Sequence, residues 1–149
     1  MQKFTRTFRA GWSDIDLNMH MRNTAYLDKA VDVRMMYFVD SGLPMTELAR
    51  RQIGPVVKSD TVEYLREVVL LEEFEVTLEA AGGAEDGSRF RLRSDFIKLD
   101  GQLAARVTST GGWLDLAARK LIAPPADVRA VMDKLSRTAD FEVLPSSRK

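Results

Sequence analysis

Three polar side chains that could act on a carbonyl group lie close together in one short segment of the sequence. They are Asp16, Asn18 and His20, and they alternate with the apolar residues Leu17 and Met19. In an extended or gently turning loop, this alternation points the polar groups to one side and the apolar groups to the other. A carboxylate, an amide and an imidazole would then converge on one place.

A helix is expected to begin directly after this segment, with Asn23 and Thr24 in its first turn. The first N–H groups of a helix have no partner within the helix, and the helix dipole favours negative charge at this end. Backbone amides in this position can stabilise the oxyanion that forms when a carbonyl is attacked. The segment therefore offers the groups that are needed to polarise a carbonyl and attack it.

Each polar residue of the segment also has a simpler explanation. Asp and Asn ahead of a helix are common turn formers and caps, and a single His is often a polar residue with a local hydrogen bond. Taken singly, Asp16, Asn18 and His20 are better explained in this way. Taken together at this spacing, the three residues instead favour a reactive site. The reason is that the whole run also resembles the motif of a known protein family.

The run from Ser13 to Tyr26 resembles the signature of hotdog-fold thioesterases, in particular the branch with 4-hydroxybenzoyl-CoA thioesterase-like and long-chain acyl-CoA thioesterases. That signature has an Asp, a short loop, often a His, and then Asn and Tyr at the start of a long helix. The matching residues here are Asp16, His20, Asn23 and Tyr26. Plant acyl-ACP thioesterases are more similar still over this stretch, since they share the Ser-Asp-x-Asp run at 13–16 and Asn18. They usually carry a further asparagine where this chain has Arg22.

The resemblance implies an acyl-CoA or acyl-ACP thioesterase, which hydrolyses a thioester to a free acid and a thiol. It places Asp16 as the general base that activates water, or as the nucleophile that attacks the acyl carbon. Asn18 and His20 would orient water or assist the acid–base steps, and the other carboxylate, Asp14, is interpreted as structural. Substrate-binding roles fall to the residues that open the helix: Asn23, Thr24 and Tyr26. Backbone amides near Asn23 and Thr24 would form the oxyanion hole.

Composition argues against several other classes of protein. The 149 residues fit one domain, 1–149, and 22 basic residues balance 22 acidic ones, so neither nucleic acid nor an anionic membrane is expected as a partner. The N-terminus lacks the apolar core of a signal peptide and no apolar run could cross a bilayer, so a cytoplasmic location is expected. A single His and no Cys argue against a metal site, and no Gly-x-Ser-x-Gly or glycine-rich nucleotide motif is present. We expect neither a metal nor another cofactor.

Hydrophobic periodicity predicts one long helix and several strands. The alternating segment Phe4–Ala10 is a predicted strand, and the apolar stretch Thr24–Ser41 is a predicted helix whose second half is buried on most sides. Four more strands are predicted at about 56–69, 73–80, 89–97 and 103–116. Pro124 and Pro125 begin a final helix, and residues from about 139 to 149 form a predicted tail.

This order of elements is that of a single-domain α+β hotdog fold. A curved antiparallel sheet of about five strands would wrap around the one long central helix, with a C-terminal helix in addition. Such a sheet leaves edge strands open and does not enclose an acyl chain by itself. Hotdog relatives join two sheets edge to edge into a dimer with shared active sites, and many pair the dimers again. The resemblance therefore implies a homodimer within a homotetramer.

Two other functions remain open within the same fold. Hotdog hydratases and dehydratases carry a motif that resembles Asp-x-Asn-Pro-x-His, in which the His follows the Asp by five positions. In this chain His20 follows Asp16 by four positions, and no Pro lies between them, so the hydratase motif fits less well. A non-catalytic acyl-thioester-binding protein would keep the pocket without turnover, although the retention of Asp16, Asn18 and His20 argues against it. The sequence does not determine the acyl group, nor the choice between CoA and acyl carrier protein.

A row of arginines, Arg89, Arg91 and Arg93, alternates along the predicted strand at 89–97 and has two explanations. It could bind the phosphates of coenzyme A, or it could form cross-strand ion pairs on a solvated face. We favour the ion pairs, because folding the hairpin about Glu85 places Glu79 opposite Arg91. The alternation slips at Phe96–Ile97, which predicts a bulge or an exit from the sheet.

Overall fold

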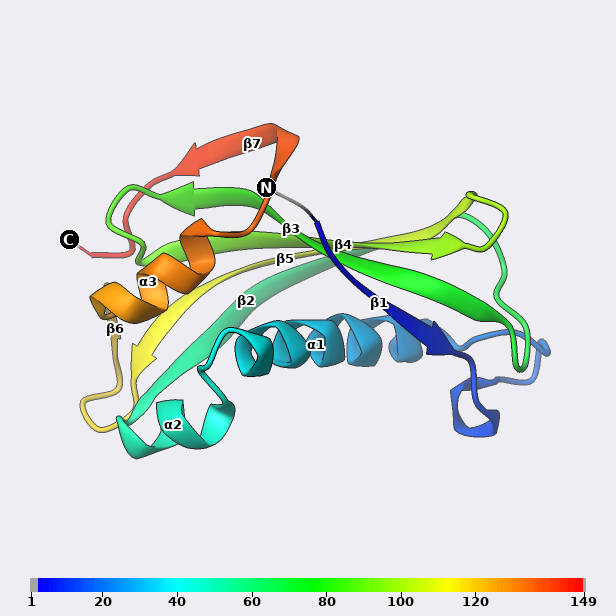
Figure 1. The fold of residues 1–149 in the computed structure, drawn as a ribbon, viewed down its shortest axis with the longest axis horizontal. Coiled ribbons are helices and arrows are strands. Elements are labelled where there is room, and N and C mark those ends of the chain that lie inside the picture. Colours follow the sequence, from blue (N-terminus) through cyan, green and yellow to red (C-terminus); the bar gives the residue numbers. More distant parts are fainter. Residues whose placement is uncertain (1–2, 149) are drawn as a thin grey trace.

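The computed structural model describes residues 3–148, and in it a largely antiparallel sheet curves around one long helix (Figure 1). The main path of the seven-stranded sheet runs in the order β1-β3-β4-β5-β2. Its strands are β1 (Phe4–Arg9), β2 (Ile53–Tyr64), β3 (Glu73–Ala84), β4 (Arg89–Lys98) and β5 (Leu103–Asp115). The helix α1 (Asn23–Asp40) lies along the concave side of this sheet. The predicted hotdog arrangement is therefore confirmed.

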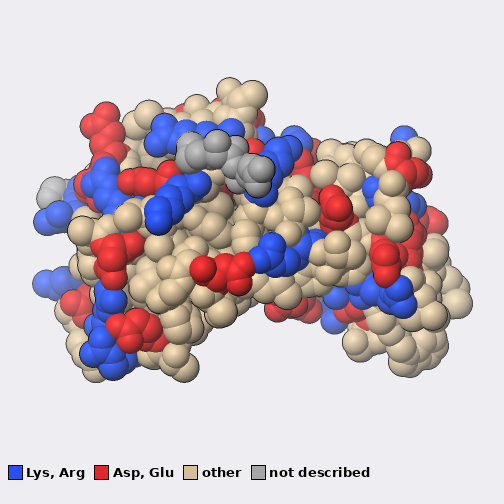
Figure 2. All heavy atoms as spheres, in the orientation of Figure 1, with Lys and Arg blue, Asp and Glu red and all other residues tan. Residues whose placement is uncertain are grey.

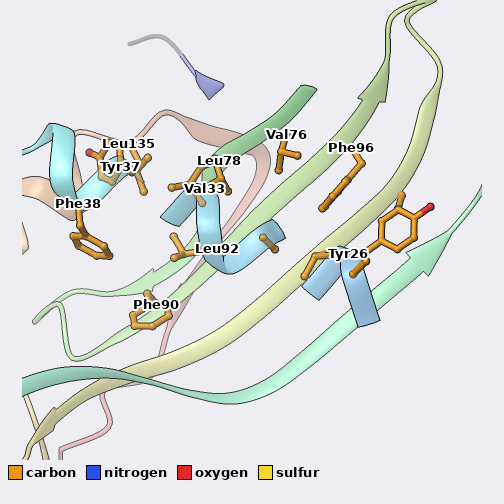
Figure 3. Close-up of a cluster of buried hydrophobic side chains, with 14 of the residues drawn as sticks. Tyr26, Val33, Tyr37, Phe38, Val76, Leu78, Phe90, Leu92, Phe96 and Leu135 are labelled. Atoms are coloured by element: carbon orange, nitrogen blue, oxygen red, sulfur yellow. The ribbon is translucent and has the colours of Figure 1, made fainter. Parts of the chain in front are cut away.

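The hydrophobic core lies between α1 and the sheet (Figure 3). The buried side of the helix is formed by small, β-branched and aromatic residues: Ala25, Tyr26, Ala30, Val33, Tyr37 and Phe38. Tyr26 packs edge-on against Phe96 of β4 with ring centroids 5.1 Å apart, and Phe38 packs against Trp113 of β5 at 6.1 Å. Burying a large apolar side chain contributes about 1.5–3 kcal/mol. These contacts therefore fix both the first and the last turn of α1 relative to the strands.

The opposite side of α1 is open in the single chain. Val31, Met36 and Val39 are 44%, 39% and 59% exposed. The prediction that the second half of this helix is buried on most sides is therefore wrong for the chain alone, because the sheet covers the helix from one side only (Figure 1). A strip of apolar side chains is left at the surface.

Three short elements lie around this frame. The helix α2 (Met45–Arg50) follows α1, and β6 (Lys120–Ile122) pairs with the end of β5. The predicted C-terminal helix is present as α3 (Ala126–Asp133), which begins directly after Pro125. Val128 and Val131 on one side of α3 are buried in the core, so this helix closes one end of it.

The C-terminal residues form a strand, so the predicted tail is wrong. The strand β7 (Arg137–Leu144) pairs in parallel with the second half of β3. Its partners on β3 begin at Ala80, just beyond Leu78, where the pairing of β3 with β1 stops. A Cβ atom at Gly82 would lie 3.0 Å from the carbonyl oxygen of Glu142, so a glycine allows the two backbones to approach. Leu144 is buried and anchors the end of the strand. Residue 149, the last of the predicted tail, lies outside the described residues.

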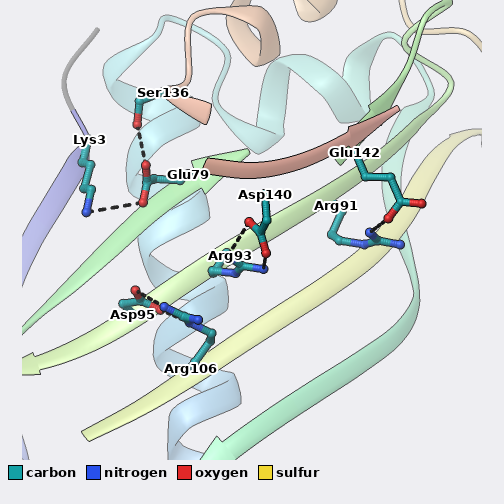
Figure 4. A network of polar contacts seen from close by, with 9 residues as sticks. All are labelled: Lys3, Glu79, Arg91, Arg93, Asp95, Arg106, Ser136, Asp140 and Glu142. Atoms are coloured by element: carbon teal, nitrogen blue, oxygen red, sulfur yellow. Dashed lines mark hydrogen bonds and ion pairs between the residues drawn. The ribbon is translucent and has the colours of Figure 1, made fainter. Parts of the chain in front are cut away.

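The arginine row of β4 forms ion pairs on the outer face of the sheet (Figure 4). Nη1 of Arg91 lies 3.0 Å from Oε2 of Glu142, and Nη1 of Arg93 lies 2.9 Å from Oδ1 of Asp140. Both acidic partners belong to β7. Of the two explanations for this row, ion pairing therefore accounts for Arg91 and Arg93. Their acidic partners lie in the segment that was predicted to be a tail.

The predicted pairing of Glu79 with Arg91 is wrong. The hairpin turns at Gly87, whose φ is +76°, and a bulge lies between Ala80 and Gly82, so Glu79 stands opposite Arg93. Glu79 is buried, and its carboxylate contacts Lys3 and Ser136 instead (Figure 4). The bulge predicted at the slip of alternation in β4 is confirmed, since the register with β5 shifts between Phe96 and Ile97.

Charged side chains of both signs are mixed over the surface. On the face shown in Figure 2, Lys and Arg lie beside Asp and Glu, without a broad patch of one sign among the described residues. None of the helices in residues 3–148 is long and apolar enough to cross a membrane.

Candidate active site at the start of helix α1

The segment that carries the predicted catalytic residues forms a tight loop, so the expected extended or gently turning conformation is wrong. The amide of Asp16 donates to the carbonyl of His20 at 3.0 Å, and the amide of Met19 donates to the carbonyl of Asp16 at 3.1 Å. Met19 adopts a left-handed φ of +66° to close the turn. Leu17 is fully exposed and Met19 is 67% exposed, so the apolar residues of the alternation point into solvent.

Neighbouring backbone segments hold this loop in place. Ile15 and Met21 pair as an isolated antiparallel bridge at its base, and His20 forms a second bridge with Val69. The amide of Met21 donates to the carbonyl of Val68 at 2.7 Å. The loop is therefore fixed between the start of α1 and the segment that follows β2.

Asp14 has partners that give it a structural role. Its Oδ2 accepts a hydrogen bond from the amide of Gly11 at 2.8 Å and lies 3.0 Å from Nζ of Lys29. Burial acts to raise the pKa of Asp14, but the Gly11 amide and Lys29 outweigh it and hold the pKa below its ordinary value. These contacts agree with the interpretation of Asp14 as the carboxylate that supports the loop.

Asp16 and His20 face each other across the loop. Oδ1 of Asp16 accepts a hydrogen bond from the amide of Asn18 at 2.9 Å and lies 3.9 Å from Nδ1 of His20. A separation of 3.9 Å is too long for a direct hydrogen bond but leaves the two groups within electrostatic reach. Their side chains are about one third exposed, at 31% for Asp16 and 28% for His20. The carboxylate thus forms a local turn and remains accessible from outside.

A hollow of about 480 Å³ brings most of the predicted site residues together. Its lining includes five of the six, namely Asp16, Asn18, His20, Asn23 and Tyr26. Thr24 contributes no side chain to this lining, and its hydroxyl accepts a hydrogen bond from Arg22 instead. Met21 also lines the hollow, and the opposite wall comes from a segment that the sequence did not single out: Tyr64, Leu65, Arg66 and Glu67.

The first turn of α1 presents free backbone amides beside this hollow. The residue before the helix, Arg22, provides no side-chain cap, and its carbonyl accepts the amide of Ala25 at 3.0 Å. The amides of Asn23 and Thr24 have no acceptor among residues 3–148, as is usual for the first positions of a helix. They are available to an anionic oxygen on a bound molecule.

Two tyrosines close the hollow on its inner side. The rings of Tyr26 and Tyr64 pack edge to face with centroids 5.4 Å apart, and the hydroxyl of Tyr64 donates to the carbonyl of Asn23 at 3.1 Å. Burial raises the pKa of Tyr26 to about 12, with Tyr64 and nearby carboxylates adding to the effect. The Tyr26 hydroxyl therefore stays protonated at neutral pH. Tyr64 was not singled out from the sequence, because it lies inside the predicted strand at 56–69 and no local pattern marks it; β2 in fact ends at this residue.

The described residues show no candidate metal centre. Within 3–148, no three His, Cys, Asp or Glu side chains are grouped so that they could hold a metal ion. The chemistry available at the hollow is that of a carboxylate, an imidazole and free amides around one accessible space.

Solved structures of similar shape come from several bacteria. A protein from Staphylococcus aureus characterised in complex with CoA is 26% identical, with a TM-score of 0.81 over 92% of this chain and 87% of that one. A 1,4-dihydroxy-2-naphthoyl-CoA thioesterase from Synechocystis has a TM-score of 0.81 at 14% identity, over 90% of this chain and 98% of its own. A probable thioesterase from Escherichia coli has a TM-score of 0.74 at 19% identity, over 89% and 98%.

The comparison with protein families gives the assignment. No curated protein matches the sequence significantly. The family model of the thioesterase-like superfamily matches residues 10–132, which include the whole loop, α1 and the strands β2 to β5. The chain therefore belongs to the thioesterase-like superfamily, and it is a thioester hydrolase with the hotdog fold that its sequence predicted.

Proposed function

We propose that this thioester hydrolase acts on acyl-CoA and that the hollow at the start of α1 is its active site. The observation that carries the proposal is that Asp16 lines the same hollow as Asn23, the first residue of α1, and that the amides of Asn23 and Thr24 are free within the described residues. The similarity to a protein from Staphylococcus aureus that was characterised in complex with CoA supports CoA, rather than acyl carrier protein, as the thiol part of the substrate.

In this proposal the thioester carbonyl oxygen is bound by the amides of Asn23 and Thr24. Asp16 takes a proton from water as the water attacks the acyl carbon, or it attacks the carbon itself to form an anhydride that water then opens. The carbon–sulfur bond breaks, and the products are a carboxylic acid and a thiol. Each well-placed amide lowers the barrier by about 3 kcal/mol, because the negative charge on oxygen develops where the amides already point.

His20 and Asn18 are proposed to support Asp16. The 3.9 Å between Asp16 and His20 leaves room for the imidazole to move towards the carboxylate or towards a water that both groups bind. Asn18 lies at the tip of the loop, where its side chain is exposed and lines the hollow. Its amide can orient water without taking part in proton transfer.

We further propose that a second copy of the chain completes the site. The strand β2 is at the end of the main strand order, and within the described residues it pairs only with β5. Apolar side chains are exposed around the hollow, with Leu17 at 100%, Met19 at 67% and Leu71 at 62%. Joining two sheets at β2 would cover this apolar surface and extend the walls of the hollow. A homodimer, paired again into a tetramer, fits the family pattern, and a cytoplasmic location stays a prediction of the sequence.

An assay of free thiol release tests the activity directly. Short, medium, long and aromatic acyl-CoAs are compared with the matching acyl carrier protein thioesters, and the same samples are analysed for hydration of an enoyl-CoA. We expect thiol release from acyl-CoA and no hydration. Hydration without thiol release would establish the hydratase alternative, and tight binding of acyl-CoA without turnover would establish the binding-protein alternative.

A further inference from the structure

A buried arginine lies in the middle of α1, far from the loop. Arg34 is 6% exposed, although a guanidinium is rarely buried unless it is paired. One of its terminal nitrogens donates to the hydroxyl of Ser109 on β5, and that hydroxyl donates to the carboxylate of Asp60 on β2. Burial lowers the pKa of Arg34, and the charge of Asp60 acts in the opposite direction. A guanidinium nevertheless remains charged in proteins, so Asp60 balances it through one bridging hydroxyl.

One donor of this guanidinium is left without a partner. The Nε atom of Arg34 is buried and has no acceptor among the described residues. Buried donors in native proteins are almost always paired, because an unmade hydrogen bond destabilises the fold. An unpaired N–H at a buried arginine therefore indicates that something else supplies the acceptor.

Arg34 lines a small cavity whose other walls are apolar. The cavity has a volume of about 180 Å³, and its walls include Val31, Phe38, Phe90 and Met132. Phe38 of α1 and Phe90 of β4 both pack edge-on against Trp113, with ring centroids 6.1 and 6.0 Å away. A space of this size and composition suits the end of an aliphatic group, with one charged donor beside it.

The cavity and the active-site hollow lie along one face of α1. Asn23, Leu27, Val31 and Arg34 are spaced four, four and three residues apart, which places them on the same side of the helix. The helix rises 1.5 Å per residue, so Asn23 and Arg34 are about 16 Å apart along its axis. An acyl group that begins at the Asn23 amide and follows this face reaches Arg34 with its distal end.

We propose that this cavity selects acyl groups that carry an uncharged oxygen, a hydroxyl or a carbonyl, near the distal end, and that Nε of Arg34 donates a hydrogen bond to it. The proposal rests on the proposed acyl-CoA hydrolysis at Asp16. An uncharged oxygen is favoured over a carboxylate because Asp60 already balances Arg34. A second carboxylate would bring an uncompensated negative charge into an apolar cavity.

The test compares pairs of substrates that differ only at the distal end. Octanoyl-, decanoyl- and dodecanoyl-CoA are each assayed against the ω-hydroxy form, the (ω−1)-keto form and the ω-carboxylate of the same length. At the best length we expect kcat/KM to be about tenfold or more higher for the hydroxy or keto form than for the plain chain, as a hydrogen bond to a charged donor would give. The ω-carboxylate should be hydrolysed more slowly than the hydroxy form.

The variant Arg34→Met should bring this ratio close to one, because it keeps an unbranched apolar side chain as far as the position of Nε and removes the whole guanidinium with its donor. Arg50→Met is the matched control, since Arg50 is exposed on α2 and paired with Glu47. It should leave the ratio unchanged. If the wild-type enzyme hydrolyses plain acyl-CoA and shows no preference for the oxygenated forms, the proposed recognition of a distal oxygen by Arg34 is wrong. The proposed function as an acyl-CoA thioesterase would still hold. A stronger preference for the ω-carboxylate would overturn the assignment to an uncharged oxygen.

A binding measurement keeps the proposal testable if Arg34→Met does not fold or if no acyl-CoA is hydrolysed. The melting temperature of the wild-type protein is measured with ω-hydroxydecanoic acid and with decanoic acid. A larger rise with the hydroxy acid supports the pocket. Equal shifts count against it, whereas the absence of any thiol release counts only against the proposed function.

Discussion

The carboxylate of Asp16 and the imidazole of His20 lie 3.9 Å apart because one backbone hydrogen bond closes the loop between them. The amide of Asp16 donates to the carbonyl of His20 at 3.0 Å, so the two residues stand at the two ends of a tight turn. Their spacing is thus set by local backbone geometry. The orientation of the pair toward the hollow depends on the bridges that tie the loop to the rest of the chain.

Asp16→Asn should reduce thioester hydrolysis by about 100-fold or more, the usual contribution of a general base. The asparagine keeps an oxygen that can accept the hydrogen bond from the Asn18 amide, so the loop should stay folded. The measurement is thiol release together with the melting temperature. Asp32→Asn, an exposed carboxylate on α1, is the control and should keep full activity. If Asp16→Asn keeps nearly wild-type turnover, Asp16 is not the general base or nucleophile. The result would then assign that role to Asp14 or favour the binding-protein alternative.

His20→Ala should cost less activity than Asp16→Asn, roughly tenfold, because the imidazole is not hydrogen-bonded to the carboxylate and has only a supporting role. Steady-state kinetics of the two single variants and the double variant measure the difference. A loss in His20→Ala as large as that in Asp16→Asn would instead make Asp16, Asn18 and His20 one catalytic triad.

Asp14→Asn should destabilise the fold at neutral pH by about 1–3 kcal/mol, since it removes the partner of Lys29 and weakens the bond to the Gly11 amide. The folded-state pKa of Asp14 lies below its ordinary value, so its stabilisation is complete above the unfolded-state pKa of about 4 and is lost as the pH falls through the folded-state pKa. Urea unfolding of both proteins at neutral and acidic pH should show the difference in free energy shrinking in acid. A difference that is constant with pH would show that the charge of Asp14 contributes nothing.

Removing residues 137–149 should lower the melting temperature strongly, because β7 pairs with β3 and buries Leu144. The double variant Asp140→Asn/Glu142→Gln is the comparison, since it breaks the ion pairs with Arg93 and Arg91 and keeps the strand. It should lower the melting temperature much less than the truncation does, because exposed ion pairs contribute little to stability. A truncated protein as stable as the full chain would restore the view of this segment as a tail.

Light scattering at low micromolar concentration should give a mass at least twice the 16.8 kDa of one chain. Leu17→Glu should weaken this assembly and lower activity together, because Leu17 is fully exposed in the single chain and lies in the loop that holds Asp16. Leu99→Glu, at an exposed position in the turn after β4, is the control for the added charge. An active, stable monomer would contradict the proposed shared site.

Several features were predictable because they depend on short-range sequence patterns. The apolar stretch at 24–41 predicted α1 within one residue at each end, and Pro124 and Pro125 marked the start of α3. The spacing of Asp16, Asn18 and His20 identified the loop that lines the hollow. A helix, a capping proline and a motif of a few residues are each determined by neighbours along the chain.

Other features were decided only by the tertiary structure. The wall at Tyr64–Glu67, the strand β7 and the partners of Arg91 and Arg93 all depend on contacts between segments far apart in the sequence. The position of the turn at Gly87, together with a one-residue bulge beside Gly82, decided which residues face each other across the hairpin. The sequence alone determined the central helix, the class of fold and the loop that carries Asp16, Asn18 and His20. Packing of the curved sheet decided the register, the environment of the buried Arg34 and the second wall of the hollow, because long-range pairing is set by the whole core and leaves no local signal.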